Sequence, residues 1–279
     1  MSAISRSVRF RARRAVDDVW RFAFELRLRL NRRRAQTVPV RAGLVTVIVV
    51  TWNTRPYLEN LLRFVDQFPS DDALELLVID NASSDGTSRM LRTRRDVRVV
   101  KLLRNVGHGL ALDRAVHICN TEYFVTLDVD AFPIAADWIE TVVGALRRGA
   151  RLAGGWYEGY VHPSFLAMRR EDFLSAGTTF DASYTRRFRL PRPTGSLTKW
   201  DAGQLVTYQT PQPHHHVPIS SVVGPGALGT VFGEVVYHHF YSTRLSTSHE
   251  DVTRSGVTQE TGEAVWRASV DRYLPLDCR

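Results

Sequence analysis

Three short polar segments stand directly after apolar runs in this sequence of 279 residues: Thr51–Asn53, Asp80–Thr87 and Asp128–Asp130. Each supplies carboxylates, amides or a tight turn at the point where a buried strand would end. In an open parallel α/β sheet, ligands bind at the carboxyl ends of the strands. The three segments therefore predict a single ligand site, assembled at one edge of a sheet.

The two carboxylates of Asp128-Val129-Asp130 predict a divalent cation in that site. Residues two apart in a strand share a face, so both carboxylates can reach one ligand. Their hard oxygens select Mg²⁺ or Mn²⁺, and Mg²⁺ typically binds one or two carboxylates together with substrate phosphates. Carboxylates without a partner would be costly at the end of a buried strand, which favours a metal site over a chance surface pair.

Asp80 and the segment Asn105–Gly109 offer groups for the organic part of such a ligand. The Asp80 carboxylate can accept hydrogen bonds from a nucleobase N–H or from ribose hydroxyls. Alternatively it forms an Asx-turn or a helix cap, roles to which Asn81, Ser83 and Asp85 are equally suited. The two glycines of Asn105–Gly109 let the backbone approach a ligand, and the N-terminus of a following helix favours an anion.

Strands and helices alternate along the first half of the chain. The expected strands are 44–51, 74–79, 97–103 and 123–127, and the expected helices are 54–68 (with Thr54 as its cap), 87–93, 109–119 and 136–148. Such alternation predicts a mainly parallel sheet with right-handed crossovers. The second half is less regular: 166–169 and 229–237 are predicted strands, and 177–227 is predicted to be a long loop, of a length that is usually functional or disordered.

Taken in order, these segments resemble the family 2 glycosyltransferases, enzymes of the GT-A fold that use nucleotide-sugar donors. The matching pieces are the first strand with its Thr-Trp-Asn ending, Val78–Thr87, Asn105–Val116 and Thr126–Pro133, within a resemblance that covers about residues 43–180. The resemblance implies an α/β fold with a mainly parallel central sheet flanked by helices. It also implies an irregular C-terminal half that binds the acceptor.

The resemblance further implies roles for individual residues. The residues that would bind the donor are Thr51, Asn53, Asp80, Asn105, Gly107, Asp113 and Asp128. Asp113 occupies a position where the family commonly has Asn. Asp130 would bind the metal that bridges the diphosphate, and a C-terminal histidine would be a further ligand. Adjacent strand residues face opposite ways, so only one of His238 and His239 can reach the metal, and we expect His238.

Other residues are expected on the acceptor side. Asp201, between Trp200 and Gly203, is either the catalytic base, with a pKa raised by partial burial, or a simple turn residue. Trp156 and His162 are expected to contact the acceptor, with the Trp156 ring stacking on a sugar. The run His214–His216 is either a metal site or a set of exposed loop histidines.

The N-terminal segment carries the excess positive charge. Residues 1–34 hold eleven Arg against three acidic residues, whereas residues 35–279 hold 26 basic and 26 acidic groups. At 100° per residue its apolar and charged side chains segregate to opposite sides of a helix. This pattern predicts an amphipathic helix at an anionic membrane surface; the alternatives are a helix packed on its own domain and a disordered basic tail. A neutral globular part argues against a nucleic-acid partner.

The sequence thus predicts a basic arm at 1–42 and a single GT-A domain at 43–279, divided into a nucleotide-sugar half (43–135) and an acceptor half (136–279). We expect an inverting glycosyltransferase that depends on Mn²⁺ or Mg²⁺ and acts in envelope or surface polysaccharide assembly. Its expected location is cytoplasmic, on the inner face of the membrane, because no apolar run reaches the ~20 residues of a membrane span and two distant cysteines indicate no disulfide framework. A sugar nucleotidyltransferase and an inactive sugar- or membrane-binding module of the same fold are the alternatives.

Overall fold

The computed structural model describes residues 19, 22, 23, 25–182, 201–224, 228–240 and 258–274. Within these residues the strands form a seven-stranded sheet, in the order β3-β2-β1-β4-β7-β6-β8, and a four-stranded sheet, in the order β5-β11-β10-β9. Strands β1 to β4 are mutually parallel, and β7 runs antiparallel to β4. The expected α/β architecture with a mainly parallel central sheet is therefore confirmed.

The bounds of the elements are as follows. The larger sheet contains β1 (Arg41–Thr51), β2 (Leu74–Asp80), β3 (Val97–Lys101), β4 (Thr121–Leu127), β6 (Leu152–Tyr157), β7 (Tyr160–Arg169) and β8 (His214–Val217). The smaller sheet contains β5 (Ala131–Pro133), β9 (Ile219–Val223), β10 (Gly229–Phe232) and β11 (Val236–His239). The helices are α2 (Arg55–Gln67), α3 (Thr87–Leu91), α4 (His108–Ile118), η1 (Glu140–Gly144), α5 (Ala145–Arg147), α6 (Arg170–Ala176), α8 (Ala202–Gln209) and α11 (Gln259–Tyr273).

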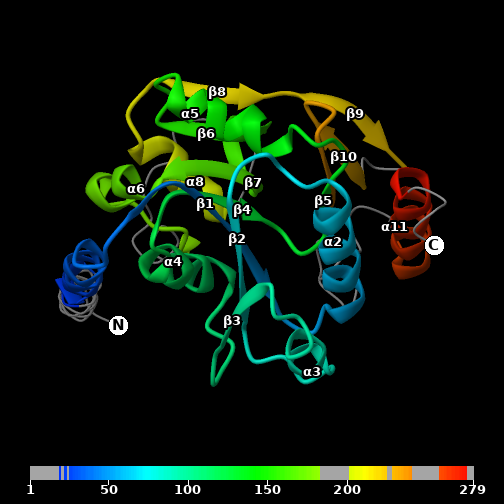
Figure 1. The fold of residues 1–279 in the computed structure, drawn as a ribbon, viewed down its shortest axis with the longest axis horizontal. Helices are drawn as coiled ribbons and strands as arrows, with labels where there is room; N and C mark the ends of the chain where they lie inside the picture. The colour runs from blue at the N-terminus through cyan, green and yellow to red at the C-terminus, as the bar shows by residue number, and fades with distance from the viewer. Residues whose placement is uncertain are drawn as a thin grey trace, which may run out of the picture.

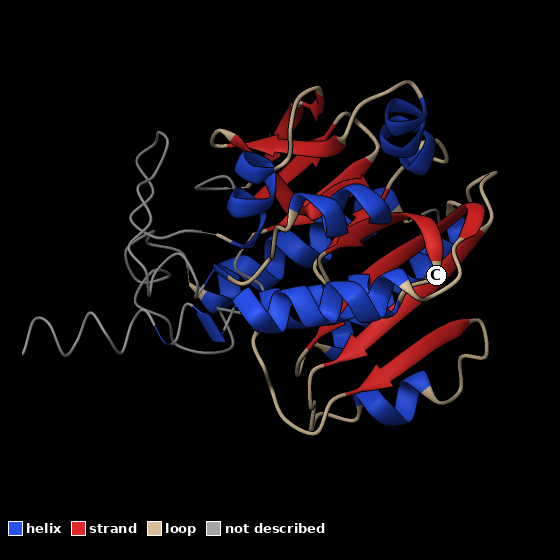
Figure 2. Ribbon diagram, turned by 90° about the vertical axis from the view of Figure 1, so that its left-hand side faces the viewer, coloured by secondary structure: helices blue, strands red, loops and turns tan. Residues whose placement is uncertain are grey.

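Strand β1 runs through the centre of the sheet and is buried on both faces. Val47 and Val49 belong to a core shared with α2, whereas Ile48 and Val50 belong to a core shared with α4, α6 and α8. This is why its sequence is a continuous β-branched run rather than an alternating one. Helices α4 and α6 lie on one side of the sheet and α2 on the other (Figure 1), and in the view of Figure 2 helices lie across the strands.

The parallel register brings the polar strand ends together. Thr51 at the end of β1 pairs with Asp80 at the end of β2. Beyond Leu127 the chain turns through Asp128–Asp130 into β5, which pairs with β11 so that Ala131 stands opposite His238. The smaller sheet therefore returns a C-terminal histidine to the edge where β1, β2 and β4 end.

Several expected elements differ in the structure. Residues 229–237 form a hairpin rather than one strand, because Gly233 and Glu234 take positive φ values and reverse the chain between β10 and β11. The expected loop at 177–227 contains α8, β8 and β9, while its residues 183–200 lie outside the described part. Thr54 precedes α2 but makes no capping bond with its side chain; its hydroxyl bonds that of Thr51 instead, at 2.8 Å.

The N-terminal helix, here residues 19, 22, 23 and 25–36, packs on the domain by one face. Leu28 and Ala35 are buried, and the Arg32 guanidinium donates to the carbonyl of Gly177 at 2.6 Å. The helix therefore packs on the domain along this face, as one of the alternatives predicted, and its contact with a membrane stays a prediction. Among the described helices, none combines the length and apolar character needed to cross a bilayer.

Candidate functional site

The ends of β1 and β2 are locked together by side-chain hydrogen bonds. Asn53, in the left-handed region at φ 53°, accepts from the backbone N–H of Ser84 at 2.8 Å and donates its own N–H to Ser83 at 3.1 Å. The buried Asp80 accepts from the N–H of Ser83 at 2.8 Å and from the hydroxyl of Ser88. Asp80 therefore shapes the turn, which agrees with the predicted alternative of an Asx-turn. Its binding to a nucleoside stays a prediction.

A second pair of amides joins the ends of β2 and β3. The Asn81 side chain donates to Asn105 at 2.9 Å and accepts from the N–H of Val106 at 3.0 Å. Asn105 also accepts from the N–H of Gly107 at 2.8 Å, and Gly107 has φ 89°, which suits glycine. These bonds fix the loop that leads into α4 and place His108 at its first turn.

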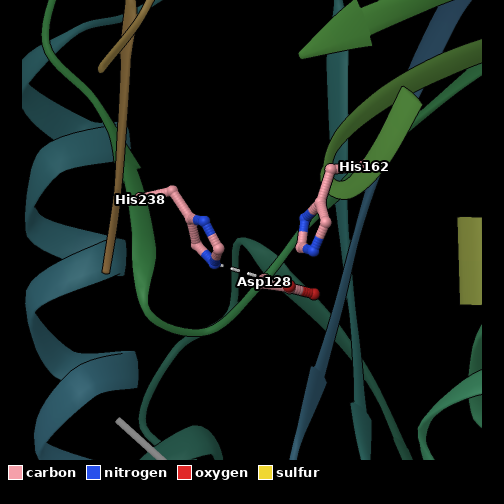
Figure 3. A group of neighbouring side chains, drawn as sticks. All are labelled: Asp128, His162 and His238. Atoms are coloured by element: carbon pink, nitrogen blue, oxygen red, sulfur yellow. Dashed lines mark ion pairs between the residues drawn. The ribbon is translucent and has the colours of Figure 1, made fainter. Parts of the chain in front are cut away.

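His238 lies between the two carboxylates of Asp128-Val129-Asp130. Its Nε2 is 3.8 Å from Asp128 Oδ2 and 3.7 Å from Asp130 Oδ1. Figure 3 shows the His238 and His162 rings on either side of Asp128. His239, by contrast, packs beside Tyr237 and Trp266. Of the two histidines, the one that faces the carboxylates is therefore His238, as expected.

This arrangement fits a divalent cation. Two ligands that hold one ion at about 2.1 Å lie about 3.0 Å apart in cis positions and about 4.2 Å apart in trans positions, so the His238–carboxylate separations fall within that range. Burial, followed by the nearby His162, lowers the pKa of His238 to about 3, which keeps its imidazole neutral. A neutral imidazole and ionised carboxylates are the forms that bind metal. The buried His238 Nδ1 has no hydrogen-bond partner within the described residues.

His162, expected on the acceptor side, lies beside this group. Ligand atoms of Asp128, His162 and His238 all lie within 4.8 Å of one another, so His162 is within reach of the same cation. Its Nδ1 accepts from the N–H of Ser164 at 3.2 Å, and its Nε2 is 3.7 Å from Asp201 Oδ2. The rings of Tyr157, Tyr160 and Phe240 each lie 5.8 Å from that of His162, whereas Trp156 stacks on His216 at 3.6 Å.

Asp201 is the N-cap of α8. Its Oδ1 accepts from the N–H of Ala202 at 2.6 Å, Gln204 completes a capping box, and its Oδ2 accepts from the Tyr160 hydroxyl at 3.0 Å. The expectation of a raised pKa is wrong. Burial does favour the neutral acid, but hydrogen bonding and charge from His162, with the bonds from Ala202 and Tyr160, hold the pKa of Asp201 well below its usual range. The carboxylate is thus ionised, with 41% of its side chain exposed.

Asp113 is engaged inside the protein. Its carboxylate accepts from the hydroxyl of Thr179 and from the N–H of Phe180 at 2.8 Å, so it ties α4 to the segment after α6. Burial raises the pKa of Asp113 to about 7. The expected contact with a donor remains a prediction, while the observed contacts are structural.

His108 is a site residue that the sequence analysis did not single out. Its Nε2 lies 3.2 Å from Asp128 Oδ1. Burial opposes its protonation, but the hydrogen bond and charge of Asp128 outweigh burial and raise the pKa of His108. The same contact helps to hold the pKa of Asp128 below its usual range against burial. Its position in the sequence could have indicated this role. His108 follows Asn105-Val-Gly at the start of a helix, where a side chain can reach the end of the neighbouring strand.

The fold and this site are typical of an α/β enzyme that binds its ligand where parallel strands end, and comparison with known families agrees. The sequence profile described as glycosyl transferase family 2 matches residues 46–205, more than half of the chain. The chain belongs to this family, and it is a glycosyltransferase with the GT-A fold. The alternative of a nucleotidyltransferase is thereby set aside.

Individual relatives are more distant. The chain is 27% identical to a dolichol-phosphate mannosyltransferase of Pyrococcus furiosus over 114 aligned residues. The aligned region covers 40% of this chain and 32% of that protein. The chain thus spans about a third of the length of that relative. Among solved structures, it is similar to the mannosyltransferase PcManGT of Pyrobaculum calidifontis in complex with GDP-Man and Mn²⁺ (TM-score 0.43, 24% identity, 60% of this chain and 58% of that one). It is also similar to TarS 1-349 of S. aureus (TM-score 0.49, 15% identity, 72% of this chain and 62% of that one).

Proposed function

We propose that this glycosyltransferase moves a sugar from a nucleoside-diphosphate donor to a hydroxyl acceptor, with inversion at the anomeric carbon and with a bound divalent cation. The observation that carries the proposal is the placement of His238 within 3.8 Å of both Asp128 and Asp130. Asp130 and His238, the predicted ligands, would hold the cation together with Asp128. When bound, Mn²⁺ or Mg²⁺ supplies positive charge that stabilises the leaving diphosphate.

The protein's own groups supply the remaining functions. Thr51, Asn53 and Asp80 stand where the first two parallel strands end, the position at which such sheets bind nucleotides. His108, at the N-terminus of α4, adds a positive charge and free backbone N–H groups beside Asp128. Cationic side chains and helix N-termini both favour a diphosphate.

Asp201 is proposed as the base. Its carboxylate is ionised and partly exposed, and Oδ2 lies 3.7 Å from His162 Nε2. It would accept the proton of the acceptor hydroxyl as the oxygen attacks the anomeric carbon in a single displacement, which inverts configuration. Tyr160 and His162 hold the carboxylate in position through Oδ2, and the capping bond to Ala202 holds Oδ1.

The acceptor is proposed to be a lipid-linked or surface carbohydrate of the cell envelope, and the cellular site to be the inner face of the membrane. The support is the basic N-terminal arm, which would keep the enzyme beside such an acceptor. The curated relative from Pyrococcus furiosus is named for a lipid-phosphate acceptor, which is consistent with this assignment.

The test begins with donor identity. The protein is screened by thermal shift against UDP-, dTDP- and GDP-sugars with Mn²⁺, and a donor at 100 times its Kd should raise the melting temperature by roughly 5 °C. The selected donor is then used in a transfer assay, and the anomeric configuration of the product is read by NMR. Inversion is expected. A product that retains the configuration of the donor, or a screen in which no nucleotide sugar binds, contradicts the proposal.

A further inference from the structure

The N-terminal helix has two apolar faces, and its domain covers one of them. Leu28 and Ala35 face the domain and are buried at 8% and 2% exposure. Val19, Phe22, Leu26 and Leu30 are exposed at 67%, 67%, 44% and 48%. Their spacing of three, four and four residues places them in one stripe along the helix. This exposed stripe is opposite the face that packs on the domain.

Arginines flank the exposed stripe on both sides. At 100° per residue, Arg29 falls on one side of the stripe and Arg27 and Arg34 on the other, while Arg33 lies in line with the stripe, beyond Leu30. All four side chains are exposed. Arg27 lies 3.9 Å from Asp181 while 47% of its side chain remains accessible. The surface thus presents an apolar ridge between two basic borders.

We propose that this ridge is a docking surface for a bilayer that contains anionic lipids. A helix that lies at a lipid surface buries its apolar side chains at the acyl boundary and places Lys or Arg at the level of the phosphates. The order of side chains around this helix is the one that such a position requires. The domain-facing side of the same helix holds the enzyme to it through Leu28, Ala35 and the Arg32–Gly177 bond.

Other occupants fit the surface less well. A second copy of the chain would bring two sets of four arginines together, and like charges repel. A nucleic acid would use the arginines but leave the apolar ridge in water. An anionic bilayer satisfies both features at once. The inference concerns the location of the enzyme and does not rest on the donor, the cation or the base.

The experiment measures flotation of the full chain with vesicles. Vesicles of phosphatidylcholine alone are compared with vesicles that contain 30% phosphatidylglycerol, at 0.1 M and 0.5 M salt. The wild-type protein should float with the anionic vesicles, and less so at the higher salt, because screening weakens charge attraction. The double variant Phe22→Ser/Leu26→Ser should show a partition coefficient at least about tenfold lower than the wild type. Burial of each large apolar side chain in the bilayer raises the partition coefficient by a factor on the order of ten or more.

A matched control removes exposed apolar surface elsewhere. Leu103 and Val222 are exposed at 103% and 57%, outside the N-terminal helix, so Leu103→Ser/Val222→Ser should float within about twofold of the wild type. The variant Arg29→Gln/Arg33→Gln should reduce the preference for anionic vesicles by roughly tenfold, because the other arginines of the segment remain. Circular dichroism and thermal melting establish that each variant is folded.

Three results would overturn the proposal. The first is a folded wild-type protein that does not float with anionic vesicles, and the second is a Phe22→Ser/Leu26→Ser variant that floats as well as its control. The third is a wild-type dimer in sedimentation velocity that the same variant converts to a monomer, which assigns the ridge to a second copy. Since flotation needs no donor and no metal, none of these results bears on the proposed chemistry.

Discussion

His162 Nε2 lies 3.7 Å from Asp201 Oδ2, and its Nδ1 accepts from the backbone N–H of Ser164. With Nδ1 acting as an acceptor, a neutral His162 carries its proton on Nε2, toward Asp201. The ring of His162 is also 5.1 Å from that of His238. His162 therefore connects the carboxylate proposed as the base with the group proposed to hold the cation.

From this tautomer we predict that His162 acts on the proposed base rather than on the metal. We expect His162→Ala to lower kcat by about tenfold, because Asp201 loses a partner that positions it, and to change Mn²⁺ affinity by less than about threefold. Steady-state kinetics and Mn²⁺ titration measure the two effects separately. A loss of Mn²⁺ affinity of tenfold or more, with kcat retained at saturating metal, would instead make His162 a metal ligand.

The proposed base can be tested without breaking the helix that it caps. In Asp201→Asn the amide oxygen can still accept from the N–H of Ala202, and Asn is as good an N-cap as Asp. We expect normal folding, an unchanged Kd for the donor and a loss of kcat of about 10²–10⁴-fold. Tyr160→Phe, which removes one hydrogen bond to the same carboxylate, should cost only a few-fold. Turnover at the wild-type level in Asp201→Asn would exclude Asp201 as the base.

His108 should affect the donor more than the metal. Its Nε2 lies 3.2 Å from Asp128 Oδ1, and its ring stands where the donor diphosphate is expected. His108→Ala should weaken binding of the nucleotide sugar by about tenfold, the value of one hydrogen bond to a charged group, while Mn²⁺ alone binds at least as tightly as before. Isothermal titration with each ligand in turn provides the comparison. Equal donor affinity in the two proteins would show that His108 does not contact the diphosphate.

Asp113 should make stability depend on pH. Its folded pKa of about 7 lies above the unfolded value of about 3.9, so the native state binds the proton more tightly. The stability that this provides is complete below about pH 4 and is lost as pH rises toward 7. In Asp113→Asn, which can retain both hydrogen bonds, this loss should disappear, and the variant should gain up to roughly 4 kcal/mol over wild type between pH 4 and pH 8.

Urea unfolding at both pH values measures this difference. Asp137→Asn is the control, because that side chain is exposed. A stability gap between the wild type and Asp113→Asn that stays constant from pH 4 to pH 8 would mean that Asp113 is ionised in the native state throughout.

The sequence predicted the site best where strand ends determine it. Buried β-branched runs define β1, β2 and β4, and parallel pairing then places Thr51 beside Asp80 and carries Asp128 and Asp130 to the same edge. The alternation of side chains along a strand predicted that only one of His238 and His239 faces the site, and the family resemblance favoured His238. These predictions depend on local patterns that survive in almost any packing of the sheet.

The remainder depended on contacts between distant segments. His108 reaches Asp128 across twenty residues of sequence. The pKa of Asp201, at the start of α8, is lowered by His162 and Tyr160 of strand β7. Helix α8 begins at a capping box, and β8 adds to the edge of β6, yet both lie in a stretch rich in Thr, Pro and Gly that has no clear periodicity. The tertiary partners, rather than the local sequence, decide these features.

The most direct test of the account is the affinity for Mn²⁺ in the presence of a nucleoside diphosphate, measured by isothermal titration for the wild type, His238→Ala and the control His215→Ala. His215 is exposed in β8, so its replacement should leave the affinity unchanged. His238→Ala should weaken Mn²⁺ binding by at least about tenfold, the usual cost of disturbing a metal site. The same Mn²⁺ affinity in all three proteins would contradict a cation at Asp128 and His238.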